Sequence, residues 1–215
     1  MHRFIFLSLF IAFLLTGCGG GSTVADPAEA ERLLREGKAA LTAGNGTQAI
    51  DLLRQAQTAD PKNVQVLSSL GHALLGQQKY EEATQILAQA IELDPDNVDA
   101  LFNLGVVYYE QGQLAPAIEY FERARAHAPA DADLLYNLGS AYAQQQDFDK
   151  AIDLYNAAIT ANPKLPMPYF GLGTIYPLQG NKQAAIEALN QFLTLSEDAD
   201  LRQRAQEMLS ELQGQ

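Results

Sequence analysis

The chain is poor in cysteine and in basic residues, and both shortages exclude classes of function. Its one cysteine, Cys18, excludes an internal disulfide framework. Lysine and arginine number 14 against 26 aspartate and glutamate residues, which gives a net charge of −12 over 215 residues. Nucleic-acid binders need Lys and Arg to neutralise phosphates, so no nucleic-acid partner is expected. The negative charge also argues against a body that lies flat on anionic lipid.

Long apolar runs are missing as well. The run Phe4–Leu15 is uncharged but shorter than the roughly 20 residues that a membrane-spanning helix needs. It follows the basic start Met1–Arg3, and this order is typical of a secretory signal peptide. We therefore expect residues 1–17 to be a signal segment that is removed and contributes nothing to the fold.

The signal segment ends in Leu15-Thr16-Gly17-Cys18. This stretch resembles the lipobox of bacterial lipoproteins, and the resemblance implies a diacylglycerol group on the Cys18 thiol. Two or three acyl chains anchor a protein stably, because each buried methylene contributes about 0.8 kcal/mol. Residues 18–25 would then be the lipidated cysteine and a flexible, Gly/Ser-rich linker.

The same resemblance implies a place in the bacterial cell envelope, lipid-anchored and extracytoplasmic. In lipoproteins of double-membraned bacteria, an aspartate after the cysteine retains the protein at the inner membrane, whereas this chain has Gly19. We therefore expect the protein to be anchored in the outer membrane and to face the periplasm, if the source has an outer membrane. The alternative is an ordinary signal peptide that happens to precede a cysteine.

Beyond the linker, small residues and prolines recur every 34 residues. The four registers are Gly37, Gly71, Gly105, Gly139 and Gly173; Ala49, Ala83, Ala117, Ala151 and Ala185; Ala56, Ala90, Ala124 and Ala158; and Pro61, Pro95, Pro129 and Pro163. Four registers with one period indicate an internal repeat rather than chance. In each copy, apolar residues at helical spacing lie on both sides of a turn, and the proline ends the second helix because it lacks an amide donor.

This pattern resembles the tetratricopeptide repeat, a helix–turn–helix unit of 34 residues. The resemblance implies an all-α fold, a right-handed superhelical α-solenoid in which neighbouring copies bury each other's apolar faces. Five copies are expected within residues 26–199, at about 30–63, 64–97, 98–131, 132–165 and 166–199. Residues 200–215 are expected to be a C-terminal capping helix and tail, with an apolar stripe of Leu201, Ala205, Met208 and Leu212.

Three local features follow from this arrangement. Asp26 and Pro27 are expected at the N-cap and first position of the first helix. Glu36 stands where later copies have leucine, because a first copy has no predecessor to cover that position. Pro177 lies inside the first helix of the fifth copy, where we expect a kink or an early end because its ring clashes with the carbonyl of Gly173.

In tetratricopeptide repeat proteins the first helices line a concave groove, and peptide-binding residues lie on its face. Carried over by register, that face has four rows: Leu34, Ser68, Phe102, Tyr136 and Phe170; Arg35, Ser69, Asn103, Asn137 and Gly171; Lys38, His72, Val106, Ser140 and Thr174; and Leu41, Leu75, Tyr109, Ala143 and Pro177. The resemblance therefore implies a peptide-binding groove whose centre is formed by Phe102, Asn103, Tyr109, Tyr136, Asn137 and Phe170.

These residue types suit a peptide ligand. Aromatic rings supply contact area at low entropic cost, and amide side chains pair with both the donor and the acceptor of a peptide backbone. Asp99 and Asp133 flank the centre and favour a ligand with Lys or Arg. The alternative is that the asparagines are repeat consensus and the aromatic rings pack between neighbouring helices.

No arrangement of residues indicates catalysis or metal binding. His72 stands alone on the groove face, and no pair of His or Cys has metal-ligand spacing. We expect no enzyme activity, no catalytic residue, no metal and no cofactor. Arg35 and Lys38 occur only in the first copy, so we do not expect the mode in which family members grip the C-terminal carboxylate of heat-shock chaperones.

Together these observations predict a membrane-anchored scaffold that binds a peptide segment of a partner protein in its concave groove. It would touch the membrane through its lipid anchor only. One alternative is a structural subunit of an envelope assembly, or of a pilus or secretion complex, that docks by its convex face. A remote alternative is a hydrolase or small-molecule binder, which would need polar side chains that converge in the groove. The sequence shows no such cluster.

Overall fold

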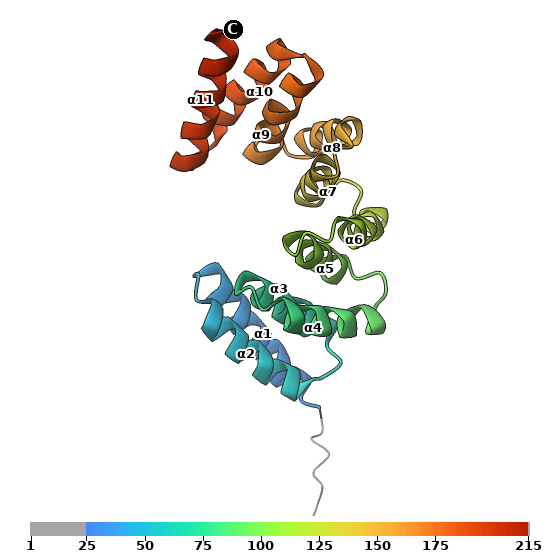
Figure 1. The fold of residues 1–215 in the computed structure, drawn as a ribbon. Coiled ribbons are helices and arrows are strands. Elements are labelled where there is room, and N and C mark those ends of the chain that lie inside the picture. Colours follow the sequence, from blue (N-terminus) through green and yellow to red (C-terminus); the bar gives the residue numbers. More distant parts are fainter. Residues whose placement is uncertain (1–24, 215) are drawn as a thin grey trace, which may run out of the picture.

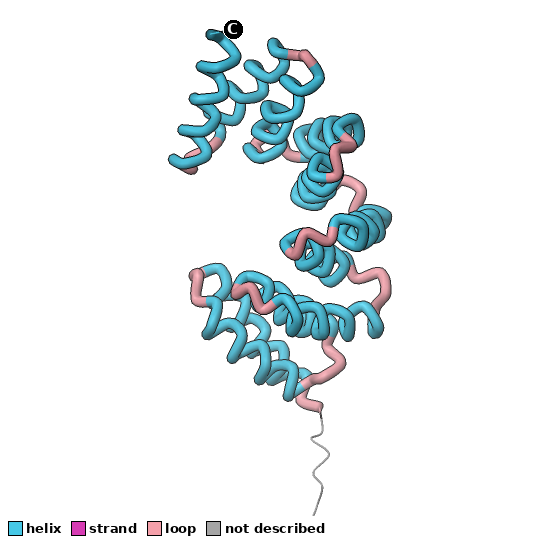
Figure 2. The backbone as a smooth tube through the Cα atoms, in the orientation of Figure 1, coloured by secondary structure: helices cyan, strands magenta, loops and turns pink. Residues whose placement is uncertain are grey.

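The computed structural model describes residues 25–214, and these fold into eleven α-helices without a strand (Figures 1 and 2). The expected signal segment, Cys18 and the linker up to residue 24 lie outside the described residues. In the described part no helix combines the length and the apolar character needed to span a bilayer.

The first ten helices form five hairpins. The first helices are α1 (Pro27–Thr42), α3 (Val64–Gly76), α5 (Val98–Glu110), α7 (Ala132–Gln144) and α9 (Pro166–Ile175). The second helices are α2 (Gly46–Ala59), α4 (Tyr80–Leu93), α6 (Leu114–His127), α8 (Phe148–Ala161) and α10 (Lys182–Leu195). A last helix, α11 (Ala199–Gly214), packs against α10. The predicted all-α solenoid of helix–turn–helix repeats is confirmed.

A glycine of each first helix faces a large side chain of its own second helix. A methyl group added at Gly105 would lie 2.5 Å from Cδ1 of Phe121, and one added at Gly37 would lie 2.7 Å from Cγ of Leu53. Both distances are far below van der Waals contact. The 34-residue glycine register therefore marks the point where the two helices of each hairpin approach most closely.

The hairpins stack into a curved rod whose inner side is formed by first helices. Each first helix contacts the first helix of the next hairpin, from α1 and α3 through to α7 and α9. No comparable contact joins successive second helices in residues 25–214. Because the first helices lie closer together than the second helices, the stack bends, and α5 and α7 lie on its concave side (Figure 1).

The start of the stack agrees with the sequence-based expectations. Asp26 is the N-cap of α1, and its Oδ1 accepts a hydrogen bond of 3.1 Å from the backbone amide of Glu29. Glu36 is exposed and forms an ion pair with Arg32 at 2.5 Å. Pro27 is the first residue of the helix. The predicted cap and the predicted exposed charge are both confirmed.

The end of the stack also agrees with them. Helix α9 ends at Ile175, and a short 3₁₀ turn, η1 (Tyr176–Gln179), contains Pro177, so the predicted early end is confirmed. Helix α11 buries Ala205 and Leu209 in a cluster that also contains Phe192 of α10. Its outward side is polar, as expected of a helix that covers the last repeat.

Candidate functional site

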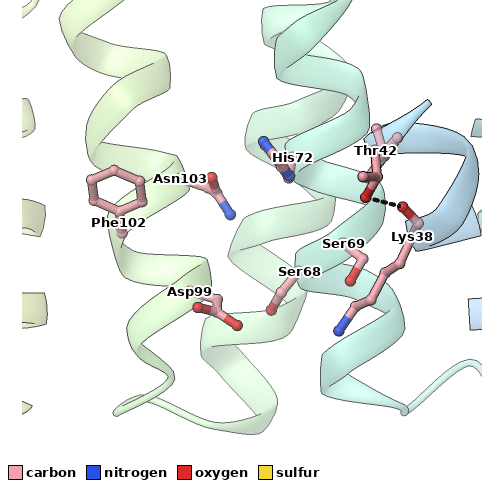
Figure 3. Close-up of a pocket in the computed structure, with 9 residues that line it drawn as sticks. Lys38, Thr42, Ser68, Ser69, His72, Asp99, Phe102 and Asn103 are labelled. Atoms are coloured by element: carbon pink, nitrogen blue, oxygen red, sulfur yellow. Dashed lines mark hydrogen bonds between the residues drawn. The ribbon is translucent and has the colours of Figure 1, made fainter. Parts of the chain in front are cut away.

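A hollow of about 410 Å³ lies on the concave face, between α1, α3 and α5. Each helix contributes three residues: Lys38, Leu41 and Thr42 from α1; Ser68, Ser69 and His72 from α3; and Asp99, Phe102 and Asn103 from α5 (Figure 3). The three helices meet because the glycine contacts hold each hairpin tightly and the first helices pack against one another. Residues about 30 and 60 positions apart in the chain thus share one site.

Two buried polar side chains in this hollow have no partner. Ser69 is 9% exposed and Asn103 is 8% exposed, and neither side chain makes a hydrogen bond to another described residue. Ser68 differs, because its hydroxyl donates to Oδ1 of Asn97 at 3.1 Å. In the described residues no fully enclosed side-chain nitrogen or oxygen lacks a partner, so the polar atoms of Ser69 and Asn103 are reached from the hollow. Both remain free to bind a ligand.

Opposite charges lie on two walls of the hollow. Lys38 projects from α1 and Asp99 from α5, on either side of Ser68 and Ser69 (Figure 3). Neither forms an ion pair with another residue of the described range. The hollow therefore offers a free cation and a free carboxylate. No group of three or more His, Cys, Asp or Glu side chains within residues 25–214 has the arrangement of a metal site.

Aromatic side chains continue the concave face from α5 to α7. The ring of Tyr136 stacks on that of Tyr155, with centroids 5.8 Å apart, and the Tyr155 hydroxyl lies 3.2 Å from Oγ of Ser140. Burial raises the pKa of Tyr155 to about 12, and burial also raises the pKa of Tyr136 and of Tyr109. These phenols therefore keep their protons, and with them their hydrogen-bond donors, to a higher pH than an exposed tyrosine does.

The residues expected from the sequence separate into three groups. Asp99, Phe102 and Asn103 meet at the hollow, and Phe102 also packs against Phe121 beneath it, with ring centroids 5.9 Å apart. Tyr109 and Tyr136 lie further along the face and are partly buried.

The other three expected residues contribute less to an open site. Asn137 donates from Nδ2 to the backbone carbonyl of Asp133 at 2.8 Å, so its amide is partly engaged within α7. The Asp133 side chain is exposed. Phe170 is 8% exposed, packs on Phe192 with ring centroids 5.0 Å apart, and has Arg204 over its ring. Phe170 is therefore part of the core of the last hairpin and offers little surface to a ligand.

Sequence reasoning undervalued the polar side of the groove. The statement that no polar cluster converges there is wrong, because Lys38, Ser69 and His72 meet Asp99 and Asn103 in the hollow. The sequence did show two adjacent serines, Ser68 and Ser69, in an otherwise apolar segment of α3. They form a cluster with other polar side chains only because α1, α3 and α5 lie side by side.

Tyr155 was also missed. At the equivalent position the other second helices carry Leu53, Leu87, Phe121 and Leu189. A methyl group added at Gly171 would lie 2.6 Å from the Tyr155 ring, so this glycine makes room for the tyrosine on the concave side. The sequence did contain two signs of this arrangement. Tyr155 stands where most copies have leucine, and Gly171 stands in the row of Asn103 and Asn137.

Comparison with family models identifies the repeat. A model described as a TPR repeat matches residues 71–112, and three models described as tetratricopeptide repeats match residues 40–89, 108–166 and 138–210. Together the matches extend from the end of α1 into α11. No curated protein sequence matches the chain.

Solved structures of other proteins share the fold. The crystal structure of MamA is 28% identical, with coverage of 74% of this chain and 92% of MamA and a TM-score of 0.64. PilW, described as a widely conserved type IV pilus biogenesis factor, is 19% identical over 88% of each chain, with a TM-score of 0.79. YrrB, described as a TPR protein with an unusual peptide-binding site, is 20% identical over 83% of this chain and 92% of its own, with a TM-score of 0.63. At these identities PilW and YrrB show a shared fold alone.

Proposed function

Models of the tetratricopeptide repeat match residues 40–210, and we propose that the chain is a protein-interaction scaffold that holds an extended segment of a partner protein against its concave face. The observation that carries this proposal is the pair Ser69 and Asn103, buried and without partners, in a hollow on that face. Their polar atoms open onto the hollow and hold no other described residue, so a ligand can bind them without breaking a contact within the protein.

The chemistry of the hollow suits a peptide. The Asn103 amide has both donors and an acceptor, so it can pair with both groups of one backbone amide. Phe102, with Tyr136 and Tyr109 further along the face, supplies area for the side chains of the bound segment. The peptide-binding site described for YrrB, a protein of the same fold, agrees with this proposal.

Site-directed crosslinking tests the groove. A photo-reactive residue in place of His72, which lines the hollow, should give a covalent partner adduct in native membranes, and one in place of the exposed Gln89 of α4 should not. Asn103→Ala should lower the yield from position 72 by about fivefold to tenfold with little change in Tm, because its amide supports no other residue. Asn137→Ala is the matched control and should have a smaller effect. Adducts from position 89 alone would instead favour docking by the convex face.

We also propose that the scaffold is anchored in the bacterial cell envelope by lipid on Cys18 and faces the periplasm from the outer membrane, where the source has one. The proposal rests on the Leu15–Cys18 segment, which lies outside the described residues. Cys18→Ser should move the protein from the membrane fraction to the soluble extracytoplasmic fraction, since the acyl chains would be lost. An unchanged distribution between the two fractions would refute the anchor and leave the groove proposal standing.

A further inference from the structure

On the concave face of α1 two cations, Arg35 and Lys38, outnumber one carboxylate, Glu31, whereas the only charged residues of α5 and α7 are carboxylates. From this pattern we propose that the bound segment is charged at both ends, with an acidic end against Arg35 and Lys38 and a basic end against Asp99 and Asp133. The inference rests on the peptide-binding function proposed above and specifies the chemistry of its ligand. It adds an acidic end to the ligand with Lys or Arg that the sequence favours.

The positive end is at α1. Arg35 and Lys38 are exposed, and neither pairs with a carboxylate among residues 25–214. The third cation of this helix, Arg32, pairs with Glu29 and Glu36 at 2.6 and 2.5 Å, so it is not available to a ligand. The remaining carboxylate of the helix, Glu31, is exposed, occupies the position equivalent to Asp99 and accepts a hydrogen bond of 3.3 Å from Nδ2 of Asn63. Arg35 and Lys38 therefore outnumber it on the groove face of α1, which leaves a small positive excess there.

The negative end begins at α5, two first helices along the stack from α1. Asp99 lines the hollow from α5, and Asp133 occupies the equivalent position of α7. Both are exposed, and no ion pair to either occurs in the described residues. Between the two ends, α3 contains no Asp, Glu, Lys or Arg and presents Ser68, Ser69 and His72. A ligand that was basic throughout would meet repulsion at α1, and one that was acidic throughout would meet it at α5.

The geometry sets the spacing of the two ends. Packed helices lie about 8–10 Å apart, so the two steps from α1 to α5 span roughly 18 Å. An extended chain advances about 3.3 Å per residue, which makes this span about five to six residues. The neutral middle of the ligand would cross Ser69 and Asn103, whose unpartnered groups face the backbone there.

Three synthetic peptides test the inference against the purified full-length chain. All are acetylated and amidated, and all have five neutral Ala and Ser residues between charged pairs. The first has two glutamates at one end and two lysines at the other. The second has the same composition with one glutamate and one lysine at each end, and the third has two lysines at both ends. Binding is followed by fluorescence anisotropy at low and high salt.

The first peptide should bind about tenfold more tightly than the second, and high salt should remove the difference. The double variant Arg35→Glu and Lys38→Glu should reverse the order, so that the third peptide becomes the tightest ligand. Lys62→Glu with Lys164→Glu, two exposed cations in interhelical loops, is the matched control with the same net charge and should keep the original order.

The outcomes separate the two proposals. Equal affinity of the first two peptides, with saturable binding, would overturn the charge pattern and leave the peptide-binding groove intact. Saturable binding of none of the three peptides would overturn the charge pattern, and the absence of adducts from position 72 would then overturn the proposed function as well.

Discussion

At the scale of single residues, close helix approach depends on glycine. Gly105 faces Phe121 with no room for a methyl group, whereas Gly76, at the end of α3, has nothing within 4 Å of the place where its Cβ would be. Both glycines are helical and neither has a positive φ. The pair therefore separates the effect of packing from that of helix propensity.

Gly105→Ala should lower the free energy of unfolding by about 1–3 kcal/mol, because the added methyl group must displace the buried Phe121 ring. Gly76→Ala should leave the free energy unchanged or raise it by up to about 1 kcal/mol, because alanine is the better helix former. Urea unfolding followed by circular dichroism measures both values. Equal destabilisation by the two variants would refute the packing explanation for the glycine register.

Tyr155 makes the second prediction at this scale. It is 3% exposed, and burial raises its pKa to about 12, against about 10 in an unfolded chain. The folded protein therefore retains this proton between pH 10 and 12 while the unfolded chain loses it. The contribution to stability is complete below pH 10 and disappears as the pH rises through 12, by about 3 kcal/mol in total.

Tyr155→Phe should remove this part of the alkaline loss. Between pH 9 and 12 the unfolding free energies of the two proteins should converge and then cross, because only the parent chain has the buried phenol to ionise. Near pH 8 the variant should be less stable by about 1 kcal/mol, since the contact with Ser140 is lost. Parallel curves over the whole range would show that Tyr155 titrates normally.

At the scale of elements, α11 completes the last hairpin. It covers Leu189 and Phe192, both fully buried, and Arg202 donates to the backbone carbonyls of Leu193 and Ser196. These carbonyls lie at the end of α10, where a helix leaves its last carbonyls without internal partners. The helix therefore protects α10 by both apolar cover and hydrogen bonds.

Ending the chain after Ser196 should destabilise the fifth hairpin by at least about 3 kcal/mol, because a large apolar side chain loses roughly 1.5–3 kcal/mol on exposure. Amide hydrogen exchange should become faster in α10 and stay unchanged in α2, because each repeat contacts only its neighbours. Ending the chain after Leu212 is the control and should change neither. Faster exchange in α2 as well would contradict this local role.

Pro177 also acts at this scale. Its position in the period places it in a first helix, and its missing amide ends α9 at Ile175 and leaves η1 in place of the last helical turn. The local effect of proline on helix geometry therefore decided where α9 ends.

At the scale of the molecule, most of the fold could be predicted from the sequence, and only part of the site. The period of 34 residues, the N-cap Asp26 with Pro27 after it, and the early end at Pro177 are local or repeated features, so one chain is enough to find them. Asp99, Phe102 and Asn103 were found by register. The sequence did not predict that the Asn103 amide lacks a hydrogen-bond partner among the described residues. It also did not predict that the Asn137 amide donates a hydrogen bond within its own helix.

The amino-acid order alone therefore decided the helices, their boundaries and the repeat, because propensity, capping and apolar spacing act over a few residues. Tertiary packing decided which polar side chains meet and which of them lack partners. Lys38, Ser69 and Asp99 belong to three different hairpins, and only the bend that brings α1, α3 and α5 together places a cation, a free hydroxyl and a carboxylate around one hollow.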